Sequence, residues 1–270
     1  MKEITFGVPN GVSLGDLLTL NPVMRLNKNS TIQFSPSKRA IELAELFIGI
    51  CKVQFVNENE LVYDIQAIKN YGFPERKNPY EHATINFLNM FDYQTDDLLP
   101  KINFYDFDIK FAKNFLEKYK NPICINMICG NYKNKDDIYT QYRMLPFEIW
   151  QKIIDILIKK GYTVLHFGLR EPHIEGINGV NFINNLSIRQ IAACLNEIKK
   201  IITVDSGGGH QLAVASNCEV YCLHPSDGIG YLSKNYHYDD NKFWKLENKR
   251  VFYDNFNSNF DHLKKLLNLN

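Results

Sequence analysis

The sequence has no excess of charge, no Cys-x-x-Cys pair and no long apolar run, and each absence excludes a class of protein. Its 270 residues carry 31 Lys and Arg against 30 Asp and Glu, so no overall basic field could hold a polyanion such as DNA. The spacing of its 6 cysteines fits neither a structural zinc site nor a redox dithiol. No stretch reaches the roughly 20 apolar residues that span a bilayer, and residues 1–25 lack the pattern of a signal peptide. We therefore expect a cytoplasmic protein with reduced, buried cysteines and at most peripheral contact with a membrane.

Apolar residues make up 45% of the chain, which is ample for a hydrophobic core, and from residue 120 onward they follow one pattern. Short apolar runs alternate with amphipathic stretches, as in β-α-β units around a parallel sheet. The pattern predicts strands at 123–128, 163–167, 200–204 and 220–223, and helices at 146–159, 187–197 and 207–216. We expect the strand at 220–223 to complete this sheet.

The first half of the chain is less regular but predicts a second, smaller α/β unit. Strands are expected at 4–7, 31–34 and 52–55, and helices at 16–26, 38–48 and 109–118. An amphipathic tail helix at 258–267 should pack back on a lobe. With a hinge placed at 119–122, the predicted segments are an N-terminal lobe (1–118), a C-terminal lobe (119–256) and a C-terminal helix (257–270).

The segment 199–213 is the most informative, because an apolar strand there meets a Gly-rich turn that opens a helix at once. The turn reads Asp205-Ser206-Gly207-Gly208-Gly209-His210. Free backbone N–H groups and the helix dipole make such a helix start an anion site. Glycines would let a diphosphate approach the backbone closely, and Ser206 and His210 could donate hydrogen bonds to it. By itself, the turn fits an ordinary strand-to-helix connection equally well.

The Gly-rich turn and other motifs resemble glycosyltransferase family 9, the lipopolysaccharide heptosyltransferases. The family's Asp-Ser/Thr-Gly-x-x-His turn matches 205–210, and its strand ending in Gly-Pro-Thr/Ser-Asp matches 220–227, with His224 in place of the Gly. Its N-terminal Gly-Asp followed by Pro-Val-Leu-Arg is similar to residues 15–25. The resemblance implies the α/β GT-B fold, in which two Rossmann-like lobes face a central cleft and a C-terminal helix docks back on the lobes.

The resemblance also implies site residues and a reaction. Asp16 would be the catalytic base, Arg143 would hold the donor phosphates, Glu171 would contact the ribose, and residues 205–210 would meet the diphosphate. The reaction would be an inverting, metal-independent transfer from a nucleotide-diphosphate sugar, ADP-heptose in the family, to a glycan hydroxyl, with no cofactor. The implied setting is the synthesis of lipopolysaccharide or another surface glycan on a lipid-linked acceptor, in the cytoplasm and peripheral to the inner membrane.

Four other functions stay open at this point. Asp106-Phe107-Asp108 matches the Asp-x-Asp metal motif of the other large glycosyltransferase fold. A nucleotide-sugar epimerase, or a nucleotide-sugar-binding protein without turnover, would share the donor site, and in the binding protein Asp16 would only cap a helix. The acceptor could also be a nucleic acid or a protein, although the neutral overall charge counts against DNA. The loop at 128–132 lacks the family's His-Pro-Gly-Ala pattern and the first lobe is short, so the resemblance does not fix the acceptor.

Overall fold

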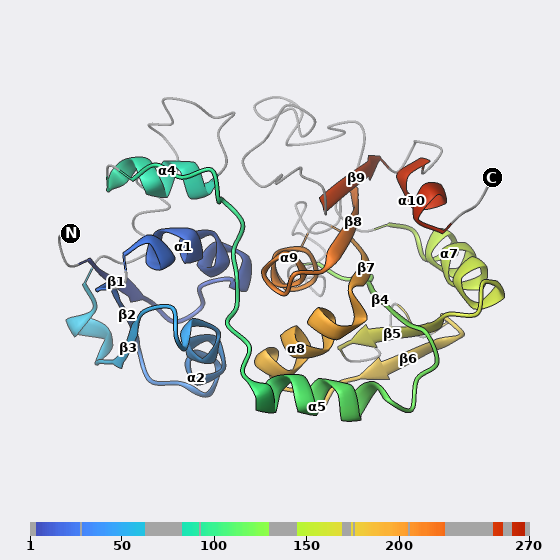
Figure 1. Cartoon of the computed structure of the whole chain (residues 1–270), viewed down its shortest axis with the longest axis horizontal. Coiled ribbons are helices and arrows are strands. Elements are labelled where there is room, and N and C mark those ends of the chain that lie inside the picture. Colours follow the sequence, from blue (N-terminus) through green and yellow to red (C-terminus); the bar gives the residue numbers. More distant parts are fainter. Residues whose placement is uncertain are drawn as a thin grey trace. The chain divides into compact units, whose positions relative to one another are not determined.

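The structure is a computed structural model and divides into two compact units between Phe104 and Tyr105. Unit 1 contains the described residues up to Phe104 and unit 2 those from Tyr105 onward, and each is built on a parallel sheet (Figure 1). No helix in the described part of the chain is long and apolar enough to cross a membrane. The structure describes residues 4–27, 29–62, 83–91, 93–129, 145–168, 174, 176–204, 206–224, 251–255 and 261–267.

Unit 1 has a three-stranded parallel sheet in the order β1-β2-β3. Its helix α1 is buried along most of its length and packs against α4. Ser13 caps α1, because its hydroxyl oxygen accepts a hydrogen bond of 3.2 Å from the backbone N–H of Asp16. The elements of this unit are β1 (Thr5–Val8), α1 (Leu14–Leu26), β2 (Thr31–Phe34), α2 (Lys38–Ala44), η1 (Glu45–Phe47), β3 (Lys52–Phe55), η2 (Glu58–Glu60) and α4 (Ala83–Met90).

The segment that leaves unit 1 is tied to the C-terminal half of α1. The side chain of Asn21 exchanges two hydrogen bonds with the backbone of Lys101, at 2.8 and 2.9 Å. Arg25 donates to the Asp97 carboxylate at 2.9 Å and to the carbonyl oxygen of Leu99 at 2.8 Å. These bonds fix the course of the chain just before it enters unit 2, and they give a structural role to the Arg in the last turn of α1.

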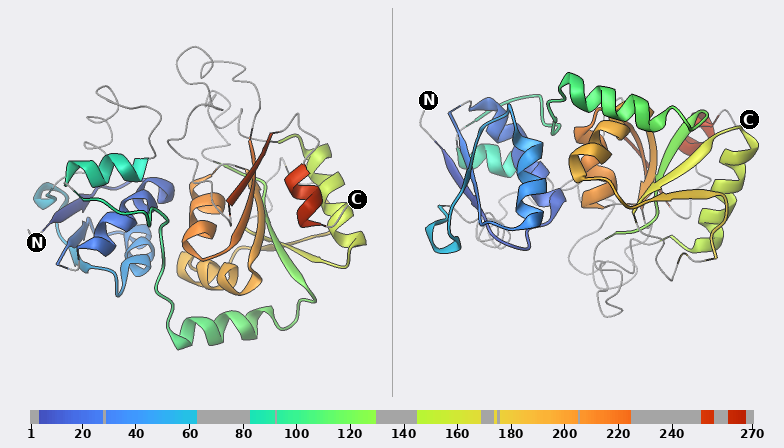
Figure 2. Two further views of the ribbon diagram at one scale, coloured as in Figure 1. Left: turned by 45° about the horizontal axis from the view of Figure 1, so that its top comes forward. Right: turned by 90° about the horizontal axis from the view of Figure 1, so that it is seen from below.

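Unit 2 has a six-stranded sheet in the order β6-β5-β4-β7-β8-β9, with every neighbouring pair parallel. This is the strand order of a doubly wound Rossmann fold, with helices on both faces of the sheet (Figure 2). The strands are β4 (Pro122–Asn126), β5 (Thr163–Phe167), β6 (Val180–Ile183), β7 (Lys200–Val204), β8 (Glu219–His224) and β9 (Val251–Asn255). The helices are α5 (Asp106–Leu116), α7 (Phe147–Lys159), α8 (Ile188–Ile198), the π-helical turn η4 (Gly207–Gln211), α9 (Leu212–Ala215) and α10 (Asp261–Leu266).

One apolar cluster of unit 2 joins the sheet to α7 and α10. Trp150 of α7 is fully buried in it, and Leu263 and Leu267 from the end of the chain pack into the same cluster. The tail helix expected at 258–267 therefore docks on unit 2, as α10.

Three details differ from the sequence-based expectations. The sheet of unit 2 does not end with the strand at 220–223, because β9 adds a further strand beside β8, and β6 adds one at the other edge. The helix expected at 207–216 consists of η4 followed by α9. The two units divide at Phe104 and Tyr105 rather than at residue 118, because α5 packs on α8 of unit 2.

Candidate functional site

The candidate site lies at the carboxyl ends of β4 and β7, where the order of the strands in the sheet of unit 2 reverses. Strands on one side of this pair follow the order β4-β5-β6, and strands on the other side follow β7-β8-β9. A doubly wound sheet binds its ligand in the crevice at this switch point. Asn126 ends β4 opposite Thr203 of β7, and the Gly-rich turn begins just after β7.

The side-chain amide of Asn126 joins three parts of the switch point. Its Nδ2 lies 2.9 Å from the carbonyl oxygen of Ile128, 3.2 Å from Oγ1 of Thr203 and 3.0 Å from Oγ of Ser206. An amide nitrogen has two hydrogens, so these three acceptors share them. Asn126 therefore holds the loop after β4 against the helix start after β7. Asn126 was not among the predicted site residues, because its only signal in the sequence is a polar amide at the end of an apolar strand.

Ser206 is the N-cap of the helix start. Its Oγ accepts a hydrogen bond of 2.9 Å from the backbone N–H of Gly209, and its carbonyl oxygen accepts from the backbone N–H of His210 at 3.0 Å. Since Oγ also accepts from Asn126, the hydroxyl hydrogen of Ser206 is the donor that it can offer to a ligand. The turn η4 continues directly into α9, so its first backbone N–H groups have no carbonyl partner within the helix, which is the feature that lets a helix start bind an anion.

Gly209 stands where the turn packs against the sheet. A Cβ built at this position would overlap Nδ2 of Asn126 and Oγ1 of Thr203. The glycines of the turn were expected to make room for a diphosphate. At Gly209, the atoms that lie close to the backbone belong to Asn126 of β4 and Thr203 of β7. Because glycine has no side chain, it leaves room for the Asn126 network to form.

We expect Gly209→Ala to destabilise unit 2 by about 1–3 kcal/mol, because the added methyl group overpacks the site and pushes Asn126 away from Ser206. Urea denaturation measures the loss. Gly176→Ala is the matched control, since a Cβ at Gly176 meets no atom within 4 Å. Equal stability of the two variants would contradict the packing role of Gly209.

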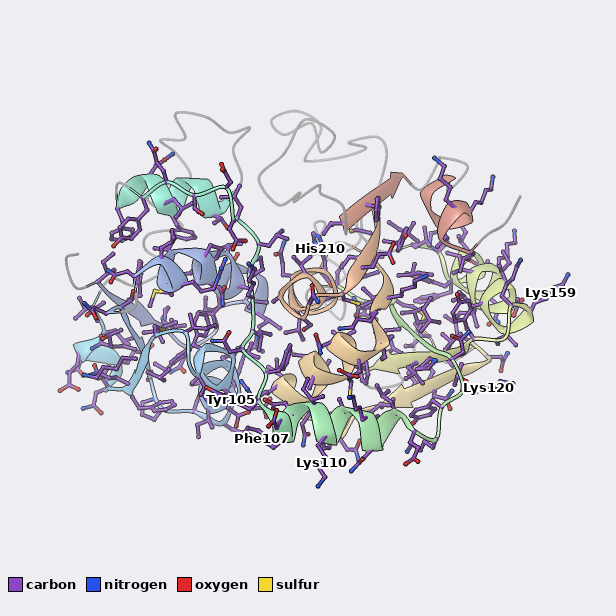
Figure 3. All side chains as sticks on the ribbon, viewed as in Figure 1. Tyr105, Phe107, Lys110, Lys120, Lys159 and His210 are labelled. Atoms are coloured by element: carbon purple, nitrogen blue, oxygen red, sulfur yellow. The ribbon has the colours of Figure 1, made fainter. Side chains whose placement is uncertain are left out.

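Of the other side chains predicted for this site, the structure describes that of His210. The side chain of His210 is fully buried within the turn region marked in Figure 3, and its contact with a phosphate oxygen stays a prediction. Arg143, Glu171 and Asp205 lie outside the described residues. Their predicted contacts with phosphate, ribose and the helix start also stay predictions.

Asp16, the predicted base, lies in unit 1, in the first turn of α1. The helix follows β1 after a short connection, so Asp16 stands beyond the carboxyl end of a parallel strand, where α/β folds place reactive groups. Its side chain is 8% exposed. An acid in the first turn also interacts favourably with the helix dipole, which is a structural role for the same residue.

The Asp-x-Asp motif of α5 forms a buried ion pair. Oδ2 of Asp108 lies 2.6 Å from Nη2 of Arg189, Oδ1 lies 3.0 Å from Nε, and both side chains are about 6% exposed. Oδ2 of Asp108 also accepts a hydrogen bond of 2.9 Å from the backbone N–H of Tyr105 and so caps α5. Because its oxygens are occupied in this way, Asp108 is a structural residue and the motif does not act as a metal ligand pair. Within the described ranges, no group of three His, Cys, Asp or Glu side chains could hold a metal ion.

His166 of β5 is a buried titratable group beside the switch point. Its Nδ1 lies 3.1 Å from the carbonyl oxygen of Ile125, and its ring packs edge-on against Phe182. Burial disfavours the imidazolium and lowers the pKa of His166 from 6.5 to about 4, although the hydrogen bond to Ile125 opposes the shift. His166 is therefore neutral at pH 7, with Nδ1 donating to the carbonyl oxygen.

This shift predicts a loss of stability in acid. Above pH 6.5 the imidazole is neutral in both states and the shift has no effect. As the pH falls from 6.5 toward 4, the unfolded chain binds a proton that the folded chain refuses, and the free energy of unfolding drops by about 3 kcal/mol in total. Urea denaturation from pH 7 to 4 should show this drop in the wild type relative to His166→Gln, which keeps a hydrogen-bond donor but does not titrate. Parallel curves for the two proteins would contradict it.

Comparison with known proteins adds the fold family. The sequence matches no protein family and no curated protein. The structure is similar to E. coli ADP-heptose lipopolysaccharide heptosyltransferase II, with a TM-score of 0.55 and 13% identity over 100% of this chain and 98% of that one. The chain has the heptosyltransferase fold.

Two further solved structures agree with this assignment. E. coli heptosyltransferase WaaC with ADP-2-deoxy-2-fluoro heptose aligns with a TM-score of 0.54 and 13% identity over 97% of this chain and 98% of its own. TibC, an iron-containing dodecameric glycosyltransferase of enterotoxigenic E. coli, aligns with a TM-score of 0.52 and 14% identity over 92% of this chain and 66% of its own. The predicted GT-B fold is confirmed, and the resemblance seen in the sequence holds at the level of the fold.

Proposed function

We propose that this protein is an inverting, metal-independent glycosyltransferase that moves a heptose-like sugar from ADP-heptose to a glycan hydroxyl. The observation that carries the proposal is the network of Asn126, Thr203 and Ser206, which holds a capped helix start at the switch point of unit 2. That arrangement suits a diphosphate, because backbone N–H groups supply the hydrogen bonds that its oxygens require. Solved structures with this fold include WaaC with ADP and TibC in complex with ADP-D-β-D-heptose, which supports ADP-heptose as the donor.

In the proposed mechanism, the acceptor hydroxyl attacks the anomeric carbon of the sugar from the face opposite ADP. Asp16 takes the hydroxyl proton as the new C–O bond forms. The bond between the anomeric carbon and the diphosphate oxygen breaks with both electrons passing to ADP. The backbone N–H groups of 206–210 and the guanidinium of Arg143 stabilise the charge that develops there, and Glu171 holds the ribose.

The proposed setting is the synthesis of lipopolysaccharide or another surface glycan. The acceptor would be a glycan or lipid-linked glycan presented at the cytoplasmic face of the inner membrane, so the enzyme would work in the cytoplasm with peripheral membrane contact. Support comes from the lipopolysaccharide heptosyltransferase among the similar structures.

Thermal shift with a panel of nucleotide sugars tests the donor. ADP-heptose at about 100 times its Kd should stabilise the protein by about 2.7 kcal/mol, whereas UDP- and GDP-sugars at the same concentration should give smaller shifts. Acceptor-dependent release of ADP then tests transfer. A protein that responds to no nucleotide sugar would contradict the proposal.

A nucleotide-sugar-binding protein without turnover is a second candidate. The observation in its favour is the position of Asp16, whose backbone N–H bonds to Ser13 and whose side chain lies in the first turn of α1, where an acid stabilises the helix. Both candidates bind ADP-heptose, and only the transferase needs the carboxylate of Asp16 for turnover.

A further inference from the structure

The outer face of α5 combines exposed aromatic rings with lysines. Among the described residues, Phe107 is the most exposed large apolar one, at 66%, and Tyr105 beside it is 40% exposed. Their rings stack with centroids 5.7 Å apart, at the end of α5 that Figure 3 marks with both residues. Two exposed rings at one point of a surface need an explanation beyond the packing of unit 2, since a single surface apolar residue would be ordinary.

The rings continue along the helix. Phe107, Phe111 and Phe115 are each four residues apart, so they form one row on α5, and the rings of Phe111 and Phe115 stack with centroids 5.9 Å apart. Phe111 and Phe115 are half-buried, so part of each residue remains at the surface. The aromatic row therefore runs from the start of α5 to its last turn.

A row of polar side chains lies next to the aromatic row. Lys110 is exposed and follows Phe107 by three residues, which places it beside that ring on the helix surface. Lys118 is also exposed and lies two residues past the end of α5. Nζ of Lys118 lies 4.9 Å from the centroid of the Phe115 ring. We use the name α5 face for Tyr105, Phe107, Lys110, Phe111, Phe115 and Lys118.

The charge around the α5 face is positive. Between Tyr105 and Lys120 the exposed charged residues are four lysines and two acids, whereas the whole chain has almost equal numbers of both signs. Asp106 precedes Lys110 by four residues and Glu117 follows it by seven, so both acids lie near Lys110, on the side away from the aromatic row. Asp108, the remaining acid of the helix, is neutralised by Arg189 inside unit 2.

The buried ion pair also holds the aromatic end of the α5 face in place. The Cζ atom of Arg189 lies 5.5 Å from the Tyr105 ring and 6.0 Å from the Phe107 ring, so the two exposed rings rest on a fixed guanidinium. α5 itself packs along α8 on the outside of unit 2, and its other side faces away from the sheet in Figures 1 and 2.

We propose that the α5 face docks on the surface of a membrane that contains anionic phospholipids. Aromatic rings suit the interface between head groups and acyl chains, and lysines beside them pair with lipid phosphates. The face projects from the side of a helix, which fits a broad lipid surface better than a peptide that would need a groove. The proposal stands on α5 alone and does not depend on the transferase activity.

Vesicle flotation tests the proposal with the full chain. Wild-type protein should float with vesicles of phosphatidylcholine mixed with phosphatidylglycerol. It should remain at the bottom of the gradient when the vesicles contain phosphatidylcholine alone. The double variant Lys110→Gln/Lys118→Gln should lower the partition coefficient about thirtyfold, equivalent to about 2 kcal/mol, because each lysine near an anionic surface contributes about 1 kcal/mol. Phe107→Ser should lower it about tenfold, since the ring can no longer enter the interface.

The matched control is Lys152→Gln/Lys159→Gln, which removes the same charge from exposed positions on α7, where Figure 3 places Lys159 away from α5. The control should bind vesicles within about threefold of the wild type. A wild-type protein that ignores the anionic vesicles, or a control that falls as far as the α5 variant, would overturn the proposal. Binding to single-stranded DNA or polyglutamate that depends on Lys110 and Lys118, without vesicle binding, would also overturn it. The stabilisation by ADP-heptose, measured without vesicles, reports on the proposed donor site separately.

Discussion

Asp16→Asn is expected to lower the kcat of sugar transfer by a factor of about 10²–10⁴ and to leave the Kd for ADP within about twofold of the wild-type value. The amide cannot accept the proton of the acceptor hydroxyl, and Asp16 belongs to unit 1 whereas the proposed diphosphate site belongs to unit 2. Acceptor-dependent ADP release measures the first quantity, and titration calorimetry measures the second.

Asp106→Asn is the matched control, because Asp106 is also an acid in the first turn of a helix, α5, and is exposed. If Asp16 only stabilises α1 through the helix dipole, both variants should lose about 0.3–1 kcal/mol of stability and keep full turnover. Retained turnover in Asp16→Asn would remove Asp16 from the role of base and favour the binding protein without turnover.

Breaking the ion pair between Asp108 and Arg189 should have the largest effect on stability. Asp108→Asn or Arg189→Leu leaves one buried charge without its partner, and each should lower the free energy of unfolding by about 3–5 kcal/mol. The double variant Asp108→Leu/Arg189→Leu should lose less than the more damaging single variant, because no uncompensated charge remains. Urea denaturation followed by circular dichroism measures all three.

Lys101→Gln provides the comparison with an exposed pair. Nζ of Lys101 lies 2.6 Å from the Asp97 carboxylate, but the two side chains are 51% and 44% exposed, so solvent screens the attraction and the loss should stay below about 1 kcal/mol. If the buried and exposed variants lost the same stability, the ion pair would not be what fixes α5 on unit 2.

The sequence predicts most of the strands, because short apolar runs between amphipathic stretches leave little choice of element. The strands at 31–34, 52–55, 163–167 and 200–204 have those bounds in the structure. β6 and β9 escaped notice because a polar residue interrupts or ends each short apolar run: β6 reads Val-Asn-Phe-Ile and β9 reads Val-Phe-Tyr-Asp-Asn. The boundary between the units was misplaced because the amphipathic pattern of α5 shows that it packs on something and does not show what.

The candidate site likewise has features that the sequence predicts and contacts that it does not. The Gly-rich turn and its position after a strand are local features, so the sequence alone points to them. Asn126 and Ser206 are 80 residues apart, and their hydrogen bond exists only because β4 and β7 are neighbours in the sheet. The packing role of Gly209 depends on the same tertiary contact. No pattern along the chain records these pairings, which arise from strand order.

The binding of ADP to two variants of Ser206 tests the central claim most directly. Asp and Asn both serve well as N-caps, and both side chains can accept the hydrogen bonds that Ser206 accepts from Gly209 and Asn126. Only Ser206→Asp adds a negative charge where the diphosphate is proposed to lie. Titration calorimetry should show ADP binding to Ser206→Asn close to the wild type, a Kd at least about tenfold higher for Ser206→Asp, and equal binding of uncharged adenosine by all three proteins. Equal affinity of the two variants for ADP, or no binding of ADP by the wild type, would contradict a diphosphate site at the switch point of unit 2.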